Sequence, residues 1–179
     1  PSAGAPRTDY AYYAAGEADA CTGIVPVLQD FNRDRMKSVS RRIDATRALT
    51  TFTCDYDALG RPRETKNPDG TRTRMTYDFR GSVTRVVVDV GGLALTTDNT
   101  YDALGALVEI RLPRTTTKGR AGFRYRHDDQ ERVTSVEQGY FSPAGGFVPL
   151  QSMHYVYDSR SNRIRTEYPD WRLRAYSTF

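Results

Sequence analysis

Hydrophobic and polar residues alternate along much of this chain, and the alternation predicts β-strands. Phe52, Cys54 and Tyr56 occupy every second position, with polar residues between them, and the same alternation recurs over 123–127 and 153–157. Because successive side chains of a strand point to opposite faces, each apolar set lines one face of a sheet. No window of three helical turns is amphipathic. The pattern therefore predicts an all-β chain.

Short stretches rich in Gly, Pro, Asn and Asp separate the predicted strands. Examples are Asn67-Pro68-Asp69-Gly70, Gly91-Gly92 and Ser142-Pro143-Ala144-Gly145-Gly146. Their regular spacing is typical of successive antiparallel hairpins. We expect residues 31–179 to form one repeat β-sheet segment. Residues 1–30, which are rich in Ala and Gly, are expected to be an irregular lead-in, with a short helix or irregular stretch across 25–35.

A Tyr-Asp pair followed by Gly recurs along the chain. The first positions of its five copies are 21, 24, 26 and 30 residues apart, and a period in this range indicates a repeat architecture. The fourth copy has His in place of Tyr, and the last two copies lack the Gly. The positions that define the repeat are Tyr56, Asp57, Gly60, Tyr77, Asp78, Gly81, Tyr101, Asp102, Gly105, His127, Asp128, Tyr157 and Asp158.

Each residue of the repeat has a structural interpretation. The Tyr ends a strand on its apolar face, so the Tyr side chains of neighbouring copies are expected to form a buried aromatic ladder. The Asp stands at the first position of a type I turn, where its carboxylate accepts backbone N–H groups, and Gly is favoured at the fourth position. Glu131 and Ser161 replace this Gly in the last two copies, which predicts a different or looser turn there.

The motifs at 56–61 (Tyr-Asp-Ala-Leu-Gly-Arg), 101–105 (Tyr-Asp-Ala-Leu-Gly) and 157–163 (Tyr-Asp-Ser-Arg-Ser-Asn-Arg) resemble the Rhs, or YD-repeat, family. The resemblance covers about residues 45–168. It implies successive hairpins that form part of a curved, spiralling sheet or hollow shell. In bacterial polymorphic toxins and insecticidal toxin complexes of this family the shell encloses a toxic effector, and in teneurins a similar barrel serves cell adhesion.

The resemblance also implies partners and a location. A segment of this size would leave sheet edges open, so the expected partners are the remaining portion of the YD-repeat shell, or partner shell chains, and an enclosed effector polypeptide. The expected location is secreted, through a bacterial secretion or toxin-complex system. The chain begins at Pro1 without a leader and is interpreted as an excised, processed or partly built segment. Nothing here matches the self-cleavage motif of the family.

Charge and composition narrow the classes of partner. The net charge is +4, and 23 of the 26 basic residues are Arg, scattered among Asp and Glu rather than gathered in a stripe. This distribution favours cross-strand pairing on a solvated face over nucleic-acid binding. No run approaches the roughly 18 apolar residues of a membrane span.

The sequence offers few groups for catalysis or for binding a metal or cofactor. Asp128, Asp129 and Glu131 cluster, but they occupy a turn of the repeat. Cys21 and Cys54 lack metal-ligand spacing; free buried thiols are the favoured interpretation, with one disulfide as the alternative. We therefore expect no catalytic residue, no cofactor, no metal and no enzyme activity.

Two functions follow as hypotheses. The first is a structural segment of an Rhs/YD-repeat shell that encapsulates a toxin effector for secretion or delivery. The alternative is an extracellular adhesion or carbohydrate-binding YD-repeat module, in which Tyr side chains and Trp171 stack on sugars.

Overall fold

The structure is a computed structural model, and it describes residues 7–22, 30–44, 46–168 and 173–174. These residues form thirteen β-strands and no helix. The strands are β1 (Thr8–Tyr12), β2 (Met36–Arg42), β3 (Ala48–Tyr56), β4 (Pro62–Lys66), β5 (Arg72–Tyr77), β6 (Val83–Val88), β7 (Leu95–Tyr101), β8 (Leu107–Thr116), β9 (Gly119–His127), β10 (Val133–Phe141), β11 (Phe147–Tyr157), β12 (Arg163–Glu167) and β13 (Leu173–Arg174). The prediction of an all-β chain of antiparallel hairpins is confirmed.

The chain divides into two compact units. The first comprises residues 1–76 and 86–95, and the second comprises residues 77–85 and 96–179. The expected boundary near residue 30 was drawn on composition, whereas this division follows the packing of the chain. The helix considered across 25–35 lies partly outside the described residues, and the described part, 30–35, is made of turns and bends.

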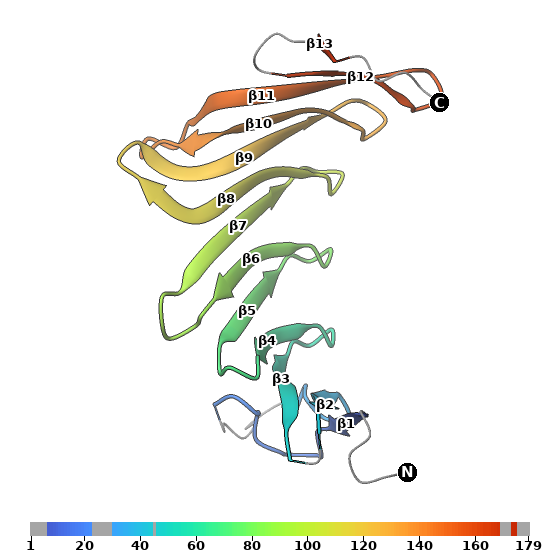
Figure 1. Ribbon diagram of the computed structural model, residues 1–179, viewed down its shortest axis with the longest axis vertical. Coiled ribbons are helices and arrows are strands. Elements are labelled where there is room, and N and C mark those ends of the chain that lie inside the picture. The colour runs from blue at the N-terminus through green and yellow to red at the C-terminus, as the bar shows by residue number, and fades with distance from the viewer. Residues whose placement is uncertain (1–6, 23–29, 45, 169–172, 175–179) are drawn as a thin grey trace. The chain divides into compact units, whose positions relative to one another are not determined.

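In the first unit, each of the strands β1 to β5 pairs antiparallel with the next (Figure 1). Ser38 of β2 lies opposite Phe52 of β3, and Glu64 of β4 lies opposite Arg74 of β5. The turn at Asn67 joins β4 to β5 as predicted, and the N–H of Gly70 donates to its carbonyl at 2.9 Å.

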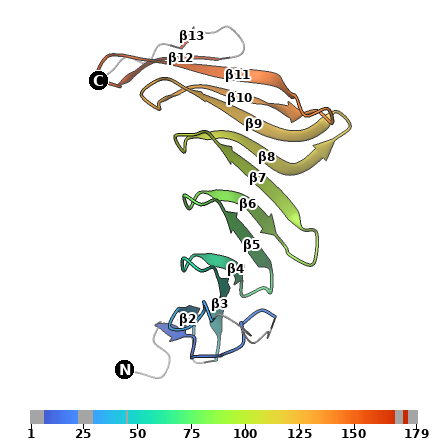
Figure 2. The same cartoon turned by 180° about the vertical axis from the view of Figure 1, so that it is seen from behind.

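In the second unit, β7 to β13 pair antiparallel in sequence order. The turns β7–β8, β9–β10 and β11–β12 lie at one end of these strands, and the turns β8–β9 and β10–β11 lie at the other (Figures 1 and 2). The Tyr-Asp repeats supply the first set of turns. One end of the hairpins therefore carries the same motif again and again.

The core is small and lies in two places. The buried apolar side chains among the described residues are Tyr13, Cys54 and Tyr56 in the first unit and Phe141 in the second. In the second unit, Gly122 and Gly139 lie opposite each other on β9 and β10. A Cβ on Gly122 would lie 2.6 Å from Cε2 of Phe141, so the missing side chain makes room for this ring.

The expected buried ladder of Tyr side chains is only partly correct. Tyr56 is buried, whereas Tyr77, Tyr101 and Tyr157 are half-buried. Within each unit the strands form a single run, so side chains on a face are covered mainly by their cross-strand neighbours. Tyr56 differs because residues of the N-terminal segment also pack against the sheet near it, as described below.

The structure joins Cys21 and Cys54 in a disulfide, with the Cα atoms 5.2 Å apart. This separation lies within the usual range for disulfide-bonded cysteines. The prediction of free buried thiols was therefore wrong, and the alternative of one bridge describes the structure. Sequence spacing alone carried no signal for the pairing, because the two residues are 33 positions apart and meet only in the folded chain.

Candidate functional site

The five Tyr-Asp turns share one pattern of backbone hydrogen bonds. In the first turn, the N–H of Gly60 donates to the carbonyl of Asp57 at 2.9 Å, and the N–H of Asp57 donates to the carbonyl of Arg61 at 3.0 Å. The same two bonds, between equivalent positions, close the turns that begin at Asp78, Asp102, Asp128 and Asp158. A four-residue turn whose last residue has positive φ is a common way to close a hairpin.

Each turn aspartate also accepts backbone N–H groups with its carboxylate. In the third turn, Oδ1 of Asp102 accepts from Leu104 and Ala106, both at 2.9 Å. Equivalent bonds from the residues two and four positions on are made to Asp57, Asp78, Asp128 and Asp158. In every turn, the carboxylate of one aspartate therefore binds a backbone N–H at the tip of the turn and another at the start of the following strand.

These hydrogen bonds stabilise the ionised aspartates. The N–H of Ala106 is the main cause that lowers the pKa of Asp102 below its usual value. For Asp128 the main cause is the Arg132 side chain, whose Nε–H donates to Oδ2 at 2.7 Å, and the pKa is again lowered. Burial opposes ionisation of Asp57, but bonds from the N–H and guanidinium of Arg61 outweigh it and lower the pKa of this carboxyl as well.

The fourth residue of each turn adopts positive φ whatever its identity. The value is 77° at Gly60, 95° at Gly81 and 97° at Gly105, and it is 61° at Glu131 and 66° at Ser161. The prediction of a different or looser turn at Glu131 and Ser161 was therefore wrong. The carboxylate bonds and the closing backbone bonds hold the same conformation despite the cost of placing a side chain in the left-handed region.

The repeat tyrosines connect the end of one strand to the start of the strand before it. In three copies the hydroxyl donates to the carbonyl of the first residue of the preceding strand. The bonds are Tyr56 to Met36 at 2.7 Å, Tyr101 to Val83 at 3.0 Å and Tyr157 to Val133 at 2.8 Å. The ring packs on the sheet while the hydroxyl finds a backbone acceptor, which is the usual requirement for a tyrosine away from solvent.

His127 stands in place of the tyrosine in the fourth copy. Its Nδ1 is buried and has no hydrogen-bond partner among the described residues. The imidazole lies close enough to Asp102 to contribute to the lowered pKa of that carboxyl. From the sequence, the default interpretation of His127 in a tyrosine position is a hydrogen-bonded, partly buried imidazole, and for this nitrogen that interpretation is wrong.

A recurring β-bulge accompanies the tyrosines, and the alternation analysis missed it. In the first repeat Asp55 lies opposite Glu64 and Tyr56 lies opposite Pro62, so Arg63 is an extra residue on β4. The same irregularity opposite the Tyr or His position leaves one extra residue in each of three further strands, at Val108, Thr134 and Ile164. Such a residue shifts the side-chain alternation of the exit strand by one position.

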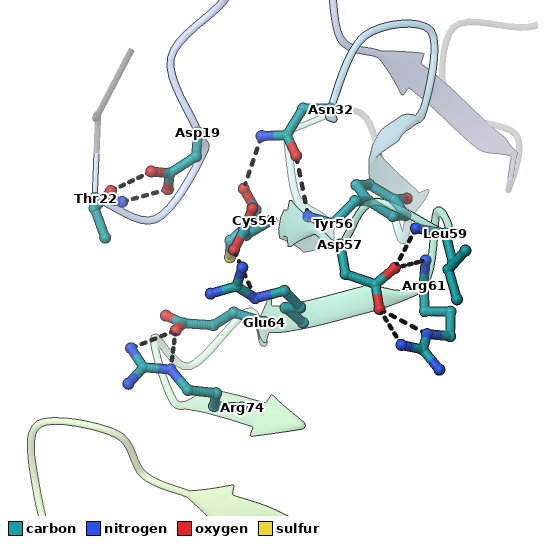
Figure 3. Close-up of polar contacts among 12 residues, drawn as sticks. Asp19, Thr22, Asn32, Cys54, Tyr56, Asp57, Leu59, Arg61, Glu64 and Arg74 are labelled. Atoms are coloured by element: carbon teal, nitrogen blue, oxygen red, sulfur yellow. Dashed lines mark hydrogen bonds and ion pairs between the residues drawn. The ribbon is translucent and has the colours of Figure 1, made fainter. Parts of the chain in front are cut away.

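Carboxylates flanked by arginines lie on the strands. In the first unit, Oε1 of Glu64 is 3.0 Å from Nη1 of Arg72. Its Oε2 is 2.8 Å from Nη2 of Arg74 (Figure 3). In the second unit, Glu109 pairs in the same way with Arg111 and Arg124 at 3.3 and 3.0 Å. Glu64 and Glu109 each lie directly opposite one of their arginines on the next strand, as the scattered charge predicted.

The second unit contains one further carboxylate between two arginines. Asp98 pairs with Arg85 and Arg120, and Arg120 also donates to the carbonyls of Leu112 and Arg111 at 2.6 and 3.0 Å. The side chain thereby satisfies carbonyl groups where β8 and β9 lose regular register. We interpret these clusters as cross-strand ties within the sheet.

Asp128 and the two cysteines, which were considered for acid–base or metal chemistry, have structural partners. Asp128 is occupied by its turn and by Arg132. The ligand atoms of Cys21, Cys54 and Glu64 lie within 4.8 Å of one another, which is the kind of cluster that holds a metal ion. The two sulfurs are bonded to each other, however, and both oxygens of Glu64 are paired with arginines. Trp171, part of the sugar-binding hypothesis, lies outside the described residues.

Sequence analysis also missed the N-terminal contacts around Tyr56. The N–H of Tyr56 donates to Oδ1 of Asn32 at 3.0 Å, and Nδ2 of Asn32 donates to the carbonyl of Cys54 at 3.5 Å (Figure 3). Tyr13 donates its hydroxyl to the carbonyl of Thr53 at 2.7 Å, and burial raises its pKa to about 12. The aromatic cluster around Tyr13 was visible in the sequence, but its partners lie about 40 positions away.

Comparison with known proteins gives one match to a family and several matches of fold. Residues 56–94 match the family model described as RHS Repeat, and these residues include the first two Tyr-Asp turns. No curated protein matches the chain. In the described residues no helix is long and apolar enough to cross a membrane.

Several solved structures have a similar fold, and one of them is a Tc holotoxin pore. A crystal structure of TcdB2-TccC3 aligns with a TM-score of 0.60 over 81% of this chain at 18% identity. A crystal structure of TcdB2-TccC3-TEV gives 0.59 over 75% at 17% identity, and the Tc holotoxin pore of Photorhabdus luminescens gives 0.59 over 81% at 18% identity. The chain spans only 7% of the length of each of those chains. At this level of identity the likeness is one of fold.

Proposed function

Because the chain is a member of the Rhs, or YD-repeat, family, we propose that it is a structural segment of a shell that encapsulates a toxin effector for secretion or delivery. The observation that carries the proposal is the repetition of one hairpin. The same turn, the same carboxylate acceptor and the same bulge recur from copy to copy. Repetition of this kind extends a sheet without making any single copy a distinct site.

The turn carboxylates support a structural role rather than catalysis. A general acid or base at neutral pH usually has a pKa near 7. The pKa values of Asp57, Asp78, Asp102, Asp128 and Asp158 are all shifted the other way, below the usual value of an aspartate. Groups that are ionised at neutral pH and already accept several N–H bonds suit the closure of a hairpin.

The proposed partners are further strands and an enclosed polypeptide. The residues of β1 are all exposed, and this strand is paired with β2 along one side. Proteins generally cover or pair such an edge, because an open edge invites aggregation. We propose that the remaining portion of the YD-repeat shell, or a partner shell chain, pairs here. The solved structures of similar fold are toxin complexes, which supports a secreted or delivered product.

A protease-protection experiment tests the proposal. The chain is expressed in its native gene context, and the purified particle is treated with a broad-specificity protease. We expect a non-repeat polypeptide to resist cleavage until the sheet is disrupted. Tyr101→Ala should release that protection, whereas Leu104→Ser, at a turn tip whose side chain is 74% exposed, should leave it intact.

Two results would overturn the proposal. One is a particle in which no polypeptide is protected although the repeats are folded. The other is saturable binding of cell-surface glycans by that unfilled particle, which would favour the adhesion or carbohydrate-binding alternative.

A further inference from the structure

A short N-terminal segment is fastened onto the first unit, and the repeat does not explain it. Residues 13–22, named the strap from here on, follow β1 and lie beside β3 (Figure 1). Figure 3 shows two of its residues, Asp19 and Thr22, on the loop near Cys54. The strap has no counterpart in the Tyr-Asp repeats, whose strands are joined by tight turns.

The strap is attached at both ends. At its start, Tyr13 is buried, with 2% of its surface exposed, and its hydroxyl donates to Thr53 and accepts the N–H of Ala20 at 3.0 Å. Near its end, the disulfide joins Cys21 to Cys54. Between these points an ion pair links Glu17 to Lys37, and both of its side chains keep about 30% of their surface exposed.

The covered part of β3 is the most buried stretch of the first unit. Thr53, Cys54 and Tyr56 keep 6%, 1% and 5% of their surface exposed. The equivalent repeat tyrosine in the second unit, Tyr101, is only half-buried. Tyr13 and Cys21 of the strap contact Thr53 and Cys54, whereas Tyr56 is covered by Asn32 and Arg35, which follow the strap in the sequence.

The disulfide is the contact that contributes most to holding the second half of the strap against β3. Half-exposed ion pairs contribute little to stability because solvent screens them. A covalent link between residues 33 positions apart lowers the conformational entropy of the unfolded chain, and it therefore stabilises the folded chain more than the ion pair does. Cys21 is the more exposed of the two cysteines, because it is half-buried and Cys54 is almost fully buried.

We propose that the strap is a redox-sensitive device, closed when Cys21 and Cys54 are oxidised and open when they are reduced. A thiolate of a dithiol reductant attacks the more accessible Cys21 sulfur, and Cys54 leaves as a thiolate and takes a proton. The second thiol of the reductant then releases Cys21 as a thiol, and the reductant ends as its own disulfide. Two electrons pass to the protein. Opening would uncover Thr53 and Cys54 of β3. This inference does not rest on the proposed shell function.

Hydrogen exchange read by mass spectrometry on the full chain tests the proposal. The oxidised chain is compared with the chain reduced by dithiothreitol and with Cys21→Ser, which leaves the buried Cys54 in place. We expect the amide of Ala20, which donates to the Tyr13 hydroxyl, to exchange at least about tenfold faster after reduction, because opening breaks this hydrogen bond. Cys21→Ser should match the reduced chain and should not respond to dithiothreitol.

The amides of Gly105 and Glu131, which close two turns of the second unit, serve as the internal control. Their exchange should stay unchanged on reduction. Equal protection of Ala20 in the oxidised and reduced chains would overturn the proposal. So would faster exchange at Gly105 and Glu131, which would mean general unfolding, or free thiols in chain purified under oxidising conditions.

Discussion

At the scale of single residues, the turn aspartate is the group on which each repeat depends. Its carboxylate accepts two or more N–H groups, and its own N–H and carbonyl close the turn, as at Asp102. N–H groups that a tight turn would leave unpaired, such as those of Leu104 and Ala106, are thereby matched, which avoids the cost of orphaned polar groups. The fourth residue is set by this network, so Gly is an advantage there and not a requirement.

The fourth position of the turn gives a paired prediction. Glu131→Gly should raise the free energy of unfolding by about 0.5–1 kcal/mol, because Gly adopts positive φ without the steric cost of a Cβ. Gly105→Ala should lower it by about 1 kcal/mol for the same reason. The nearest atom to the new Cβ at Gly105 is 3.7 Å away, so packing contributes little. Urea denaturation of the three proteins measures both effects, and a stabilising Gly105→Ala would contradict the account.

The tyrosine hydroxyl gives a second prediction at this scale. Tyr101→Phe removes the donor to the carbonyl of Val83 and should cost about 0.5–1.5 kcal/mol of unfolding free energy. The cost should lie toward the lower value, because Asn99 also donates to that carbonyl at 2.9 Å. Tyr10→Phe, at a side chain that is 60% exposed, is the matched control and should change stability by less than about 0.5 kcal/mol. Equal losses in both variants would count against the role of the hydroxyl.

At the scale of the element, the repeated unit is a hairpin with a built-in bulge. The bulged residue, such as Arg63 or Thr134, lies opposite the Tyr or His that ends the preceding strand. It increases the local twist and moves the following side chains to the other face. In each strand that follows such a turn, the alternation of side chains between the two faces is therefore shifted by one position after the bulged residue. This shift recurs in four hairpins.

Most of the strands and turns could be predicted from the sequence, because local residues set them. Alternation located β3 and β9, and the Asp and Gly positions located the turns. The bulge could not be predicted, because it depends on how two strands align and not on the pattern within either one. The disulfide and the Asn32 contacts could not be predicted for a related reason, because Cys21 and Asn32 meet their partners on β3 only in the folded chain.

The charged clusters give a prediction for the element. Glu64→Ala should lower the free energy of unfolding by about 2–3 kcal/mol, because Arg72 and Arg74 would then face each other without a carboxylate. The loss should fall below that of a fully buried pair, since 52% of the Arg74 side chain is exposed. Asp9→Ala removes the exposed pair with Arg7 and should cost less than about 0.5 kcal/mol. Denaturant unfolding of the two variants measures both losses. Equal losses of unfolding free energy would show that the buried carboxylate of Glu64 contributes no more to stability than the exposed one of Asp9.

At the scale of the whole molecule, the chain gains order from repetition rather than from one large core. Few apolar side chains are fully buried among the described residues, and exposed apolar groups such as Leu59 and Phe79 occupy turn tips. Hairpins of this kind depend on their neighbours on both sides, which suits a segment that continues into further strands. The proposed shell supplies those neighbours.

The turn aspartates predict how the molecule responds to acid. Their pKa values are lowered in the folded chain, so the folded state binds fewer protons than the unfolded state at mildly acidic pH. Their contribution to stability is complete above the unfolded value of about 4 and is lost as the pH falls through the lower folded values. Circular dichroism from pH 7 to pH 2 should show a constant signal down to about pH 4 and loss of strand structure below it. A free energy of unfolding that increases as the pH falls would contradict this prediction.

The measurement that tests the central claim most directly is a cryo-electron microscopy reconstruction of the product that this chain forms in its native gene context. The account predicts that β1–β13 form part of the wall of a closed particle, paired with further strands at β1, and that polypeptide density fills the interior. An open sheet whose β1 edge stays unpaired, or a closed particle with an empty interior, would contradict it.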